Sequence, residues 1–471
     1  MPEATGALVR RLRAELGRDR VLASRTDREA RMTDALGPGR GFRDAGFEAV
    51  PPLAVVLPAN AGEVAAALRI ARDTGTPVVA YGAGTGLMGG ARTIRPGLVV
   101  DLRRLDRILE IDVLDGHVWA QAGTVLDRVN RELAPHGLTL GHDPWTVEVA
   151  TVGGAIATNG LGFLGGAYGS MGDQTLAVEV ALADGSIVRT KPVLPRSTGF
   201  DLTRLFVGTE GAFGAVTAAA LRAFPLPEAR QLLGFRFRRF EDGFDAAVAM
   251  AQAGVRPALL DYGDCFAPAE AGQPAVPVEP PTLYLGFEGV RSVVAALAAF
   301  AASACRARGG EAMSEEEVLR FWDHRHDVAR RFVETRGRWG RLQRRSEGAF
   351  DYIHVALPVS RVLRYRAAAM ALAQAEGAEV IETGLWVRPG LFSMVLVASP
   401  GDDATGRMAA AVDACLRLAI DEGGSVEYCH GAGIRLAHLM AEEHGPALEA
   451  MRALKQALDP AHILNPGKMG L

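Results

Sequence analysis

Short apolar runs and one segment with a helical spacing of apolar residues follow one another between residues 53 and 80. Residues 53–58 form an apolar run that predicts a strand. Apolar positions then recur on one face of a helix predicted over residues 61–74, with Asn60 as its N-cap. A second strand, predicted over residues 77–80, follows directly. This order of strand, helix and strand predicts a βαβ unit, and the segment after residue 80 leaves from the carboxyl end of its second strand.

Strands and helices continue to mix along the rest of the chain. Hairpins are predicted over residues 108–123 and 176–189, with a helix over 124–136 that closes at Gly137. From about Pro225 the pattern predicts a second group of elements. Its strands are predicted at 232–238, 257–262, 282–288, 352–357, 391–399 and 425–429, and its helices at 241–253, 290–308, 315–335, 359–374, 404–422 and 451–458. We expect one split βαβ-type sheet with helices on a face.

Composition narrows the class of protein. The chain has 471 residues, enough for two or three domains, and its net charge of −4 with scattered arginines argues against a nucleic-acid partner. No apolar run reaches about 18 residues, so no membrane span is predicted, and the N-terminal residues read as an amphipathic helix rather than a signal peptide. Four cysteines without a CxxC pair fit a reducing compartment and exclude a cysteine zinc site, so we expect a cytoplasmic protein. A homodimer is left open.

The stretch YGAGTGLMGG, residues 81–90, is the main candidate for binding chemistry. Half of its residues are glycine, so successive backbone N–H groups can turn inward and close on an anion such as a pyrophosphate. It is not a Walker loop, because no Gly-Lys-Ser/Thr follows, and it is a poor Rossmann fingerprint, because the next segment holds Pro96 and opens no helix. A tight surface turn is the alternative for this stretch taken alone. Two further segments rich in small residues strengthen the binding interpretation.

The first of these segments, residues 143–169, contains seven glycines from Gly153 to Gly169 and almost no charge. Such a chain is either flexible or wrapped around something large and flat, and its place inside a well-patterned domain favours the second option. The glycines are expected to interrupt regular packing there. The other segment, residues 206–214, again places small residues beside an apolar strand.

Together with a C-terminal Asn465-Pro466-Gly467-Lys468, these motifs resemble, in order, the FAD-binding flavoproteins of the vanillyl-alcohol oxidase and p-cresol methylhydroxylase superfamily. The resemblance is to the branch that holds glycolate oxidase, D-lactate and D-2-hydroxyglutarate dehydrogenases and alkyl-dihydroxyacetonephosphate synthase, and it covers roughly residues 50–471. It implies an α+β fold: a two-subdomain FAD-binding domain of the p-cresol methylhydroxylase type (residues 1–226), a ferredoxin-like cap (227–429) and a C-terminal segment that returns to the FAD domain (430–471).

The resemblance also implies which residues bind FAD. The first loop would hold the pyrophosphate, residues 143–169 would line the isoalloxazine and ribityl portion, and residues 208–216 would approach the adenine side. The residues implied are Tyr81, Gly82, Ala83, Gly84, Thr85, Gly86, Leu87, Gly89, Gly90, Pro144, Thr151, Val152, Gly153, Gly154, Ala157, Thr158, Asn159, Gly160, Tyr168, Gly169, Glu210, Gly211, Val216 and Asn465. Because the first loop holds no histidine for covalent attachment, we expect FAD to be noncovalent.

The metal site common in the hydroxy-acid branch is not expected in this chain. Those enzymes hold a divalent metal with two histidines of a G-H-x-G-D-G-N-x-H segment and a glutamate before a His-Gly pair. The corresponding residues 382–393 contain no histidine, and Cys429 stands at the glutamate position. Cys429 is then a ligand, a nucleophile or, as is commoner for a lone cysteine, a small core residue.

His430 is the implied catalytic base, taking the hydroxyl proton as hydride leaves for the flavin. Arg325 stands where the family grips a substrate carboxylate, although a solvated helix face is the alternative for it. Tyr352 and His354 are also predicted as catalytic residues, as weak catalysts that line the pocket. We therefore expect an FAD-dependent oxidase or dehydrogenase that acts on a small alcohol or 2-hydroxy acid and passes electrons to oxygen, a quinone or an electron-transfer protein. The alternatives are a flavin enzyme without net redox, resembling the synthase, and a catalytically silent FAD-binding protein.

Overall fold

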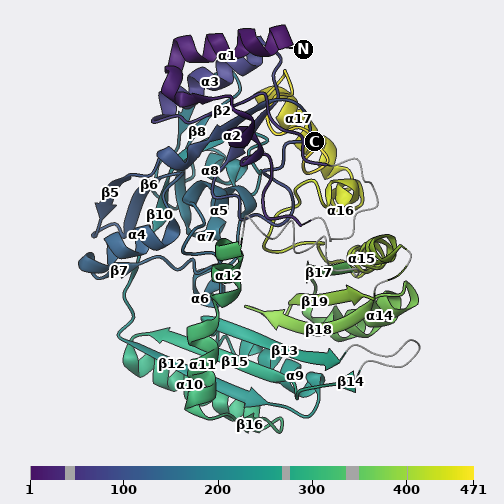
Figure 1. The fold of residues 1–471 in the computed structure, drawn as a ribbon. Coiled ribbons are helices and arrows are strands. Elements are labelled where there is room, and N and C mark those ends of the chain that lie inside the picture. The colour runs from purple at the N-terminus through teal and green to yellow at the C-terminus, as the bar shows by residue number, and fades with distance from the viewer. Residues whose placement is uncertain (1, 38–47, 268–275, 336–348, 400, 402) are drawn as a thin grey trace.

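The computed structural model describes residues 2–37, 48–267, 276–335, 349–399, 401 and 403–471, and its sheets fall into an N-terminal group and one large later sheet (Figure 1). The first sheet has the order β1-β2-β4-β3. Its elements are β1 (Val21–Leu22), β2 (Ala54–Val56), β3 (Val78–Tyr81) and β4 (Leu98–Asp101), with α1 (Pro2–Leu16), α2 (Arg25–Glu29) and α3 (Ala61–Asp73) around them. Strands β2 and β3 both run parallel to β4. Asn60 caps α3 by accepting the Glu63 N–H at 2.9 Å, so the predicted βαβ unit is confirmed.

The second sheet, of order β5-β6-β10-β8-β9, is antiparallel throughout and contains both predicted hairpins. Its strands are β5 (Ile108–Asp112), β6 (His117–Gln121), β8 (Thr175–Ala181), β9 (Ile187–Arg189) and β10 (Ala215–Arg222). The helices beside it are α4 (Leu126–Leu133), α5 (Val152–Thr158), α6 (Gly165–Tyr168), α7 (Met171–Gln174) and α8 (Leu202–Phe206), and β7 (Leu138–Thr139) pairs with β11 (Phe224–Pro225).

The segment 143–169 is more regular than the sequence predicts. Gly153 and Gly154 lie inside α5 instead of interrupting regular structure. The reason is close packing, because a Cβ at Gly153 would lie 2.8 Å from the Cβ of Ala122. Glycine lets this helix approach the segment after β6. The close contact offsets the lower stability that glycine gives to a helix.

The large sheet is built from two equivalent halves. The order β12–α9–β13–β15–α10 along the chain is repeated as β17–α14–β18–β19–α15, and the halves meet where β13 pairs with β18 (Figure 1). All strand pairs are antiparallel. The strands are β12 (Ala229–Arg236), β13 (Leu259–Ala267), β14 (Val276–Pro277), β15 (Thr282–Gly289), β16 (Glu311–Ala312), β17 (Ala349–Ala356), β18 (Glu379–Trp386) and β19 (Leu391–Ala398). The helices are α9 (Phe240–Gln252), α10 (Arg291–Arg306), α11 (Glu315–His324), α12 (Asp327–Thr335), α14 (Val362–Ala375) and α15 (Ala404–Asp421).

Three predictions for this half need correction. Strand β18 was not predicted, because the polar Thr383 interrupts its apolar pattern, yet that side chain is fully buried and bonded to Asp264. The helix predicted over 315–335 breaks between α11 and α12. The strand predicted over 425–429 does not form beyond isolated bridges, because the Glu427 carboxylate accepts the next three backbone N–H groups and turns the chain.

The C-terminal segment returns to the first sheet. After α16 (Met440–His444) and α17 (Ala447–Leu458), the Asn465 N–H donates to the Val78 carbonyl at 2.7 Å, and the Val78 N–H donates to Ile463 at 2.7 Å. This pairs residues 463–465 with β3, beside the Gly-rich loop. No helix in the described ranges is both long and apolar enough to cross a membrane. Most of the arm predicted over 34–49 and of the link over 267–281 lies outside the described residues.

Candidate functional site

Segments far apart in the sequence converge on the Gly-rich loop at the end of β3. Asn465 Nδ2 donates to the carbonyls of Gly90 at 2.8 Å and Glu210 at 2.6 Å. The Glu210 Oε1 atom accepts the Gly433 N–H at 2.8 Å, and the Ile434 N–H donates to the Met88 carbonyl at 3.0 Å. The first loop, the loop around Glu210, the turn after His430 and Asn465 therefore form one structure.

These segments touch closely at two glycines, and Gly433 cannot be replaced without a backbone clash. A Cβ at Gly90 would lie 2.7 Å from Glu210 Oε2. Gly433 has a φ of +54°, and a Cβ there would lie 1.9 Å from the Met88 carbonyl oxygen. These contacts exclude the alternative of a free surface turn for residues 81–90.

Helix α5 brings a further group of the predicted FAD residues to this place. Thr151 is its N-cap, and its Oγ1 would lie 2.6 Å from a Cβ on Gly82. At the other end, the Ala157 carbonyl accepts the Glu210 N–H at 2.9 Å, and Thr158 borders Gly431. The predicted residues on or directly beside this helix are Thr151, Val152, Gly153, Gly154, Ala157, Thr158, Asn159 and Gly160.

Four other predicted FAD residues lie outside these contacts. Tyr168 and Gly169 are two of them. The Tyr168 hydroxyl donates to Glu288 of β15 at 2.6 Å and so joins α6 to the large sheet. Pro144 lies in the turn before α5, and Val216 lies within β10. Their predicted contact with FAD stays a prediction.

The junction also buries two ionisable groups: Glu210, which is among the predicted FAD residues, and Lys468, which the sequence analysis did not list as a site residue. Burial raises the pKa of the Glu210 carboxyl to about 7. The hydrogen bond from the Gly433 N–H lowers this pKa, but by less than burial raises it. Burial likewise lowers the pKa of the Lys468 ammonium to about 8, while Glu210 and Asp34 act in the opposite direction. Lys468 could have been recognised as a site residue from its place in the C-terminal Asn-Pro-Gly-Lys motif.

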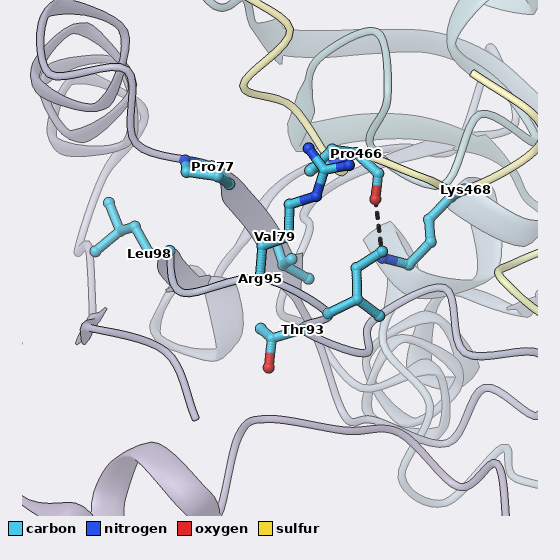
Figure 2. A pocket seen from close by; sticks show the side chains of 9 residues that line it. Pro77, Val79, Thr93, Arg95, Leu98, Pro466 and Lys468 are labelled. Atoms are coloured by element: carbon cyan, nitrogen blue, oxygen red, sulfur yellow. Dashed lines mark hydrogen bonds between the residues drawn. The ribbon is translucent and has the colours of Figure 1, made fainter. Parts of the chain in front are cut away.

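Figure 2 shows a small cavity that is lined in part by Val79 of β3 and by Lys468, whose Nζ donates to the Pro466 carbonyl at 3.4 Å. The cavity measures about 10 Å³, enough for about one water molecule and far too little for a cofactor. Its lining residues are Pro77, Val79, Thr93, Ile94, Arg95, Gly97, Leu98, Pro466 and Lys468. A buried ammonium next to a loop of backbone amides suits an anionic ligand.

A polar cluster surrounds His430, directly after the turn made by Glu427. Glu427 Oε1 accepts the N–H groups of residues 428, 429 and 430 at 3.0, 2.8 and 3.0 Å and lies 3.5 Å from His430 Nδ1. Burial raises the pKa of the Glu427 carboxyl, but the imidazoles of His430 and His354 and the backbone donors lower it by more, to about 2. Glu427 therefore stays ionised and orients the imidazole.

Three of the predicted catalytic residues meet here. The ring centres of His354 and His430 are 4.6 Å apart, and those of Tyr352 and His430 are 5.8 Å apart. The sequence analysis missed Glu427. Its position, three residues before the candidate base His430, was the available sign that it belongs to the site.

This cluster also carries donors for a metal ion. The ligand atoms of His354, Glu427, Cys429 and His430 all lie within 4.8 Å of one another. The expected absence of a metal rested on the lack of histidine in residues 382–393 and on Cys429 at the glutamate position, whereas these donors come from β17 and from the turn after residue 425.

Arg325 is the predicted catalytic residue that does not join this cluster. Its Nε donates to Asp143 Oδ2 at 3.1 Å and its Nη1 to the Trp322 carbonyl at 2.7 Å, while the guanidinium lies 3.6 Å from the Trp322 ring centre. His326 Nε2 lies 3.0 Å from Asp143 Oδ1. The Arg325 guanidinium therefore contacts Asp143 through Nε and Trp322 through Nη1, and its predicted role as a carboxylate clamp stays a prediction.

A chain of ring contacts links the Arg325 group to the His430 cluster. Phe163 contacts both His326 and Trp386, and Tyr428 contacts both Trp386 and His354.

Comparisons with known proteins add to this geometry. Residues 52–191 match a family described as FAD binding domain, and residues 226–469 match one described as FAD linked oxidases, C-terminal domain. The chain is 31% identical over 438 residues to a protein named probable D-lactate dehydrogenase, mitochondrial, from Danio rerio, covering 89% of this chain and 84% of that protein. It is 27% identical over 508 residues to the alkyldihydroxyacetonephosphate synthase of Trypanosoma brucei brucei, covering 99% of this chain and 81% of that protein.

The fold itself matches a solved structure. The crystal structure of p-cresol methylhydroxylase with substrate bound superposes with a TM-score of 0.80 at 18% sequence identity, covering 100% of this chain and 98% of that one. The predicted p-cresol methylhydroxylase type of fold is confirmed by this likeness.

Proposed function

The chain belongs to the family of FAD-linked oxidases, and from this premise we propose that it oxidises a small alcohol or 2-hydroxy acid with His430 as the base. FAD is its cofactor, and its class is FAD-dependent oxidoreductase. The observation that carries the finer proposal is the placement of His430. Its imidazole lies 3.5 Å from a buried carboxylate and one residue before Gly431, which borders the loops that converge on β3.

The described residues fit FAD. Gly433 lies against the Met88 backbone, and Gly82 and Gly90 lie against the side chains of Thr151 and Glu210, so the loop is packed closely against its neighbours. The buried Lys468 ammonium supplies positive charge near Glu210. We propose that residues 81–90 hold the pyrophosphate, that residues 143–169 line the isoalloxazine and ribityl portion, and that residues 208–216 approach the adenine. With no histidine in the first loop, binding is noncovalent.

The chemistry of the side chains follows from the charges around His430. When bound, FAD accepts the hydride that leaves the substrate carbon. His430 removes the hydroxyl proton of the substrate, and the ionised Glu427 stabilises the imidazolium that results. Tyr352 and His354 present polar groups beside the base and line the substrate pocket. The electrons then leave for oxygen, a quinone or an electron-transfer protein.

A second candidate is a flavin enzyme without net redox, similar to the alkyldihydroxyacetonephosphate synthase that matches 99% of the chain. One observation favours it. The sequence offers a single histidine in the His-Gly motif, but His354 of β17 lies with its ring centre 4.6 Å from that of His430. A pair of imidazoles suits acid and base steps on a substrate that keeps its electrons.

Anaerobic mixing of the FAD-loaded protein with hydroxy acids and alcohols separates these candidates. The first proposal expects bleaching of the flavin absorbance by D-lactate, glycolate or a related substrate, and the loss of bleaching in His430→Asn. The second expects an altered flavin spectrum with acyl-dihydroxyacetone phosphate and no electron transfer. A protein that binds FAD and answers neither group of substrates contradicts both and supports the silent binding protein.

A further inference from the structure

The face of the large sheet that carries Tyr352 and His354 also carries two carboxylates, Asp261 of β13 and Glu382 of β18. We infer that these two acids select a substrate whose far end carries an ammonium group and disfavour one with a second anionic group there. The inference rests on the proposed function, because it concerns the substrate of the same site. It assigns Asp261 and Glu382 as specificity-determining residues.

Strand pairing places these residues on one face. One residue from each of β17, β19, β18 and β13 (Figure 1) lies opposite the next in a single row, and the row consists of His354, Ser393, Gly384 and Gly263. Because side chains alternate between the two faces of a sheet, residues two positions away on each strand share the face of this row. Asp261 pairs with Trp386 on one side of the row, and Cys265 pairs with Glu382 on the other side. The two acids therefore flank the row on the face of His354.

The row has no side chains on β18 and β13, where it consists of two glycines. A Cβ on Gly263 would lie 2.8 Å from the Thr383 carbonyl oxygen, and a Cβ on Gly384 would lie 2.9 Å from the Tyr262 carbonyl oxygen. The three nearest atoms at each place all belong to the sheet itself. Glycine in a strand often marks a site where a ligand approaches the backbone closely. With three strand spacings of about 4.8 Å each, the row leaves a strip of roughly 14 Å from His354 to β13 for a substrate chain.

Among the residues that the structure describes, neither Asp261 nor Glu382 has a partner of opposite charge. Asp264 provides the contrast, because it lies on the opposite face of β13, where Arg366 Nη2 donates to it at 2.6 Å and Thr383 donates to it as well. Burial and the charge of Glu382 raise the pKa of Asp261 to about 7, and burial also raises the pKa of Glu382. Buried acids are normally paired, so an ammonium group on the substrate would supply the missing counter-charge.

Aromatic residues connect this pair of acids to the group around the proposed base. The ring of Trp386, opposite Asp261, lies 6.4 Å from that of Tyr428, which in turn lies 5.4 Å from that of His354. Burial raises the pKa of the Tyr428 hydroxyl, and the charge of Asp261 adds to this effect. Trp386 Nε1 is buried without a hydrogen-bond partner in the described part of the chain, so it is available to a ligand. A substrate that reacts beside His354 can extend past these rings toward the two acids.

Three substrates that differ only at the far end test this selection. They are the D forms of 6-amino-2-hydroxyhexanoate, 2-hydroxyheptanoate and 2-hydroxyheptanedioate, whose tails end in ammonium, methyl and carboxylate. Anaerobic flavin reduction is measured over a range of concentrations at about pH 8, where Asp261 is mostly ionised. We expect the KM of the ammonium tail to be at least about tenfold below that of the methyl tail, and the carboxylate tail to have the highest KM.

Charge-removing variants identify the residues responsible. Asp261→Asn and Glu382→Gln keep the size of each side chain, and each should raise the KM of the ammonium tail at least about threefold. The double variant should bring the three KM values within about threefold of one another. Glu376→Gln removes an exposed carboxylate after α14 and should keep the tenfold preference. Equal KM values for the three tails in the wild-type protein, or a preference that survives in the double variant, overturn the inference.

Analogues without the hydroxyl group separate this inference from the proposed function. Isothermal titration of the FAD-loaded protein with 6-aminohexanoate, heptanoate and heptanedioate measures the selection of the tail without oxidation, and FAD content confirms that each variant folds. A preference for 6-aminohexanoate that the double variant loses, in a protein whose flavin no hydroxy acid or alcohol bleaches, rejects the proposed function alone. Bleaching by hydroxy acids without preference among the tails in either assay rejects the inference alone.

Discussion

The molecule contains two histidine–carboxylate groups built from similar residues with different surroundings. In one, Asp143 has both oxygens occupied, by Arg325 at 3.1 Å and by His326 at 3.0 Å. In the other, Glu427 uses one oxygen for three backbone N–H groups beside His430 and has no guanidinium partner among the described residues. The His326 side chain is 9% exposed and that of His430 is 24% exposed. In the Asp143 group the charges are paired with one another. In the Glu427 group the imidazole is oriented and remains within reach of a substrate.

The largest difference is expected in turnover. Replacing His430 by Asn removes the proposed base and should lower the rate of flavin reduction by about 10²–10⁴-fold. The matched variant His326→Asn removes an imidazole that also contacts a carboxylate, and it should change this rate by less than about threefold, within the range of a minor structural change. Anaerobic stopped-flow absorbance measures both. Equal losses in the two variants would remove the distinction between the groups.

For the free energy of unfolding we expect the opposite order: a larger loss from the Asp143 group than from the Glu427 group. Asp143→Asn leaves the Arg325 guanidinium without its carboxylate partner in a site where both side chains are mostly buried. Removing one partner of such a pair costs about 3–5 kcal/mol in the free energy of unfolding. Glu427→Gln keeps an oxygen that accepts backbone N–H groups and should cost about 1–3 kcal/mol. Urea unfolding compares the two, and a larger loss for Glu427→Gln would contradict the assignment.

Glu210 extends the comparison to a buried carboxylate that accepts the Gly433 N–H and, within the described part of the chain, bonds to neither Arg nor His. Its pKa is raised in the folded protein, mainly by burial, from 4.5 to about 7. The unfolded chain therefore loses this proton at lower pH than the folded chain, so stability is greatest below pH 4.5 and falls as pH rises toward about 7. The slope from this group is at most about 1.4 kcal/mol per pH unit.

The variant Glu210→Gln should remove that slope. Unfolding of FAD-free protein by urea at several pH values across this window measures it. A wild-type free energy that rises with pH through the window, or a variant with the same slope as wild type, would show that Glu210 ionises normally in the folded state.

The parts of the fold that the sequence predicts are those with a local signature. The N-cap Asn60 and the hairpin turns act within a few residues, and glycine at Gly90 or Gly433 marks a close backbone approach whichever segment makes it. The pair of Arg325 with Asp143 joins residues 182 positions apart, so no local pattern reports it. The break between α11 and α12 has the same origin, because Arg325 and His326, the two residues of the break, pair with Asp143 while the helical periodicity of the sequence continues. The donors around His430 were likewise assembled by strand pairing, which sequence spacing does not contain.

The smallest effect is expected for Arg325→Met. A guanidinium that gripped the substrate carboxylate would contribute about 1.5–3 kcal/mol, so its loss would raise KM for a hydroxy acid roughly 10- to 150-fold. Because Arg325 is already bonded to Asp143 and stacked on Trp322, we expect KM to change by less than about threefold. Arg330→Met, which breaks a more exposed pair with Glu148, is the matched control for lost surface charge. A KM that rises strongly in the first variant alone would mean that Arg325 exchanges Asp143 for the substrate, and the group around Asp143 would then belong to the active site.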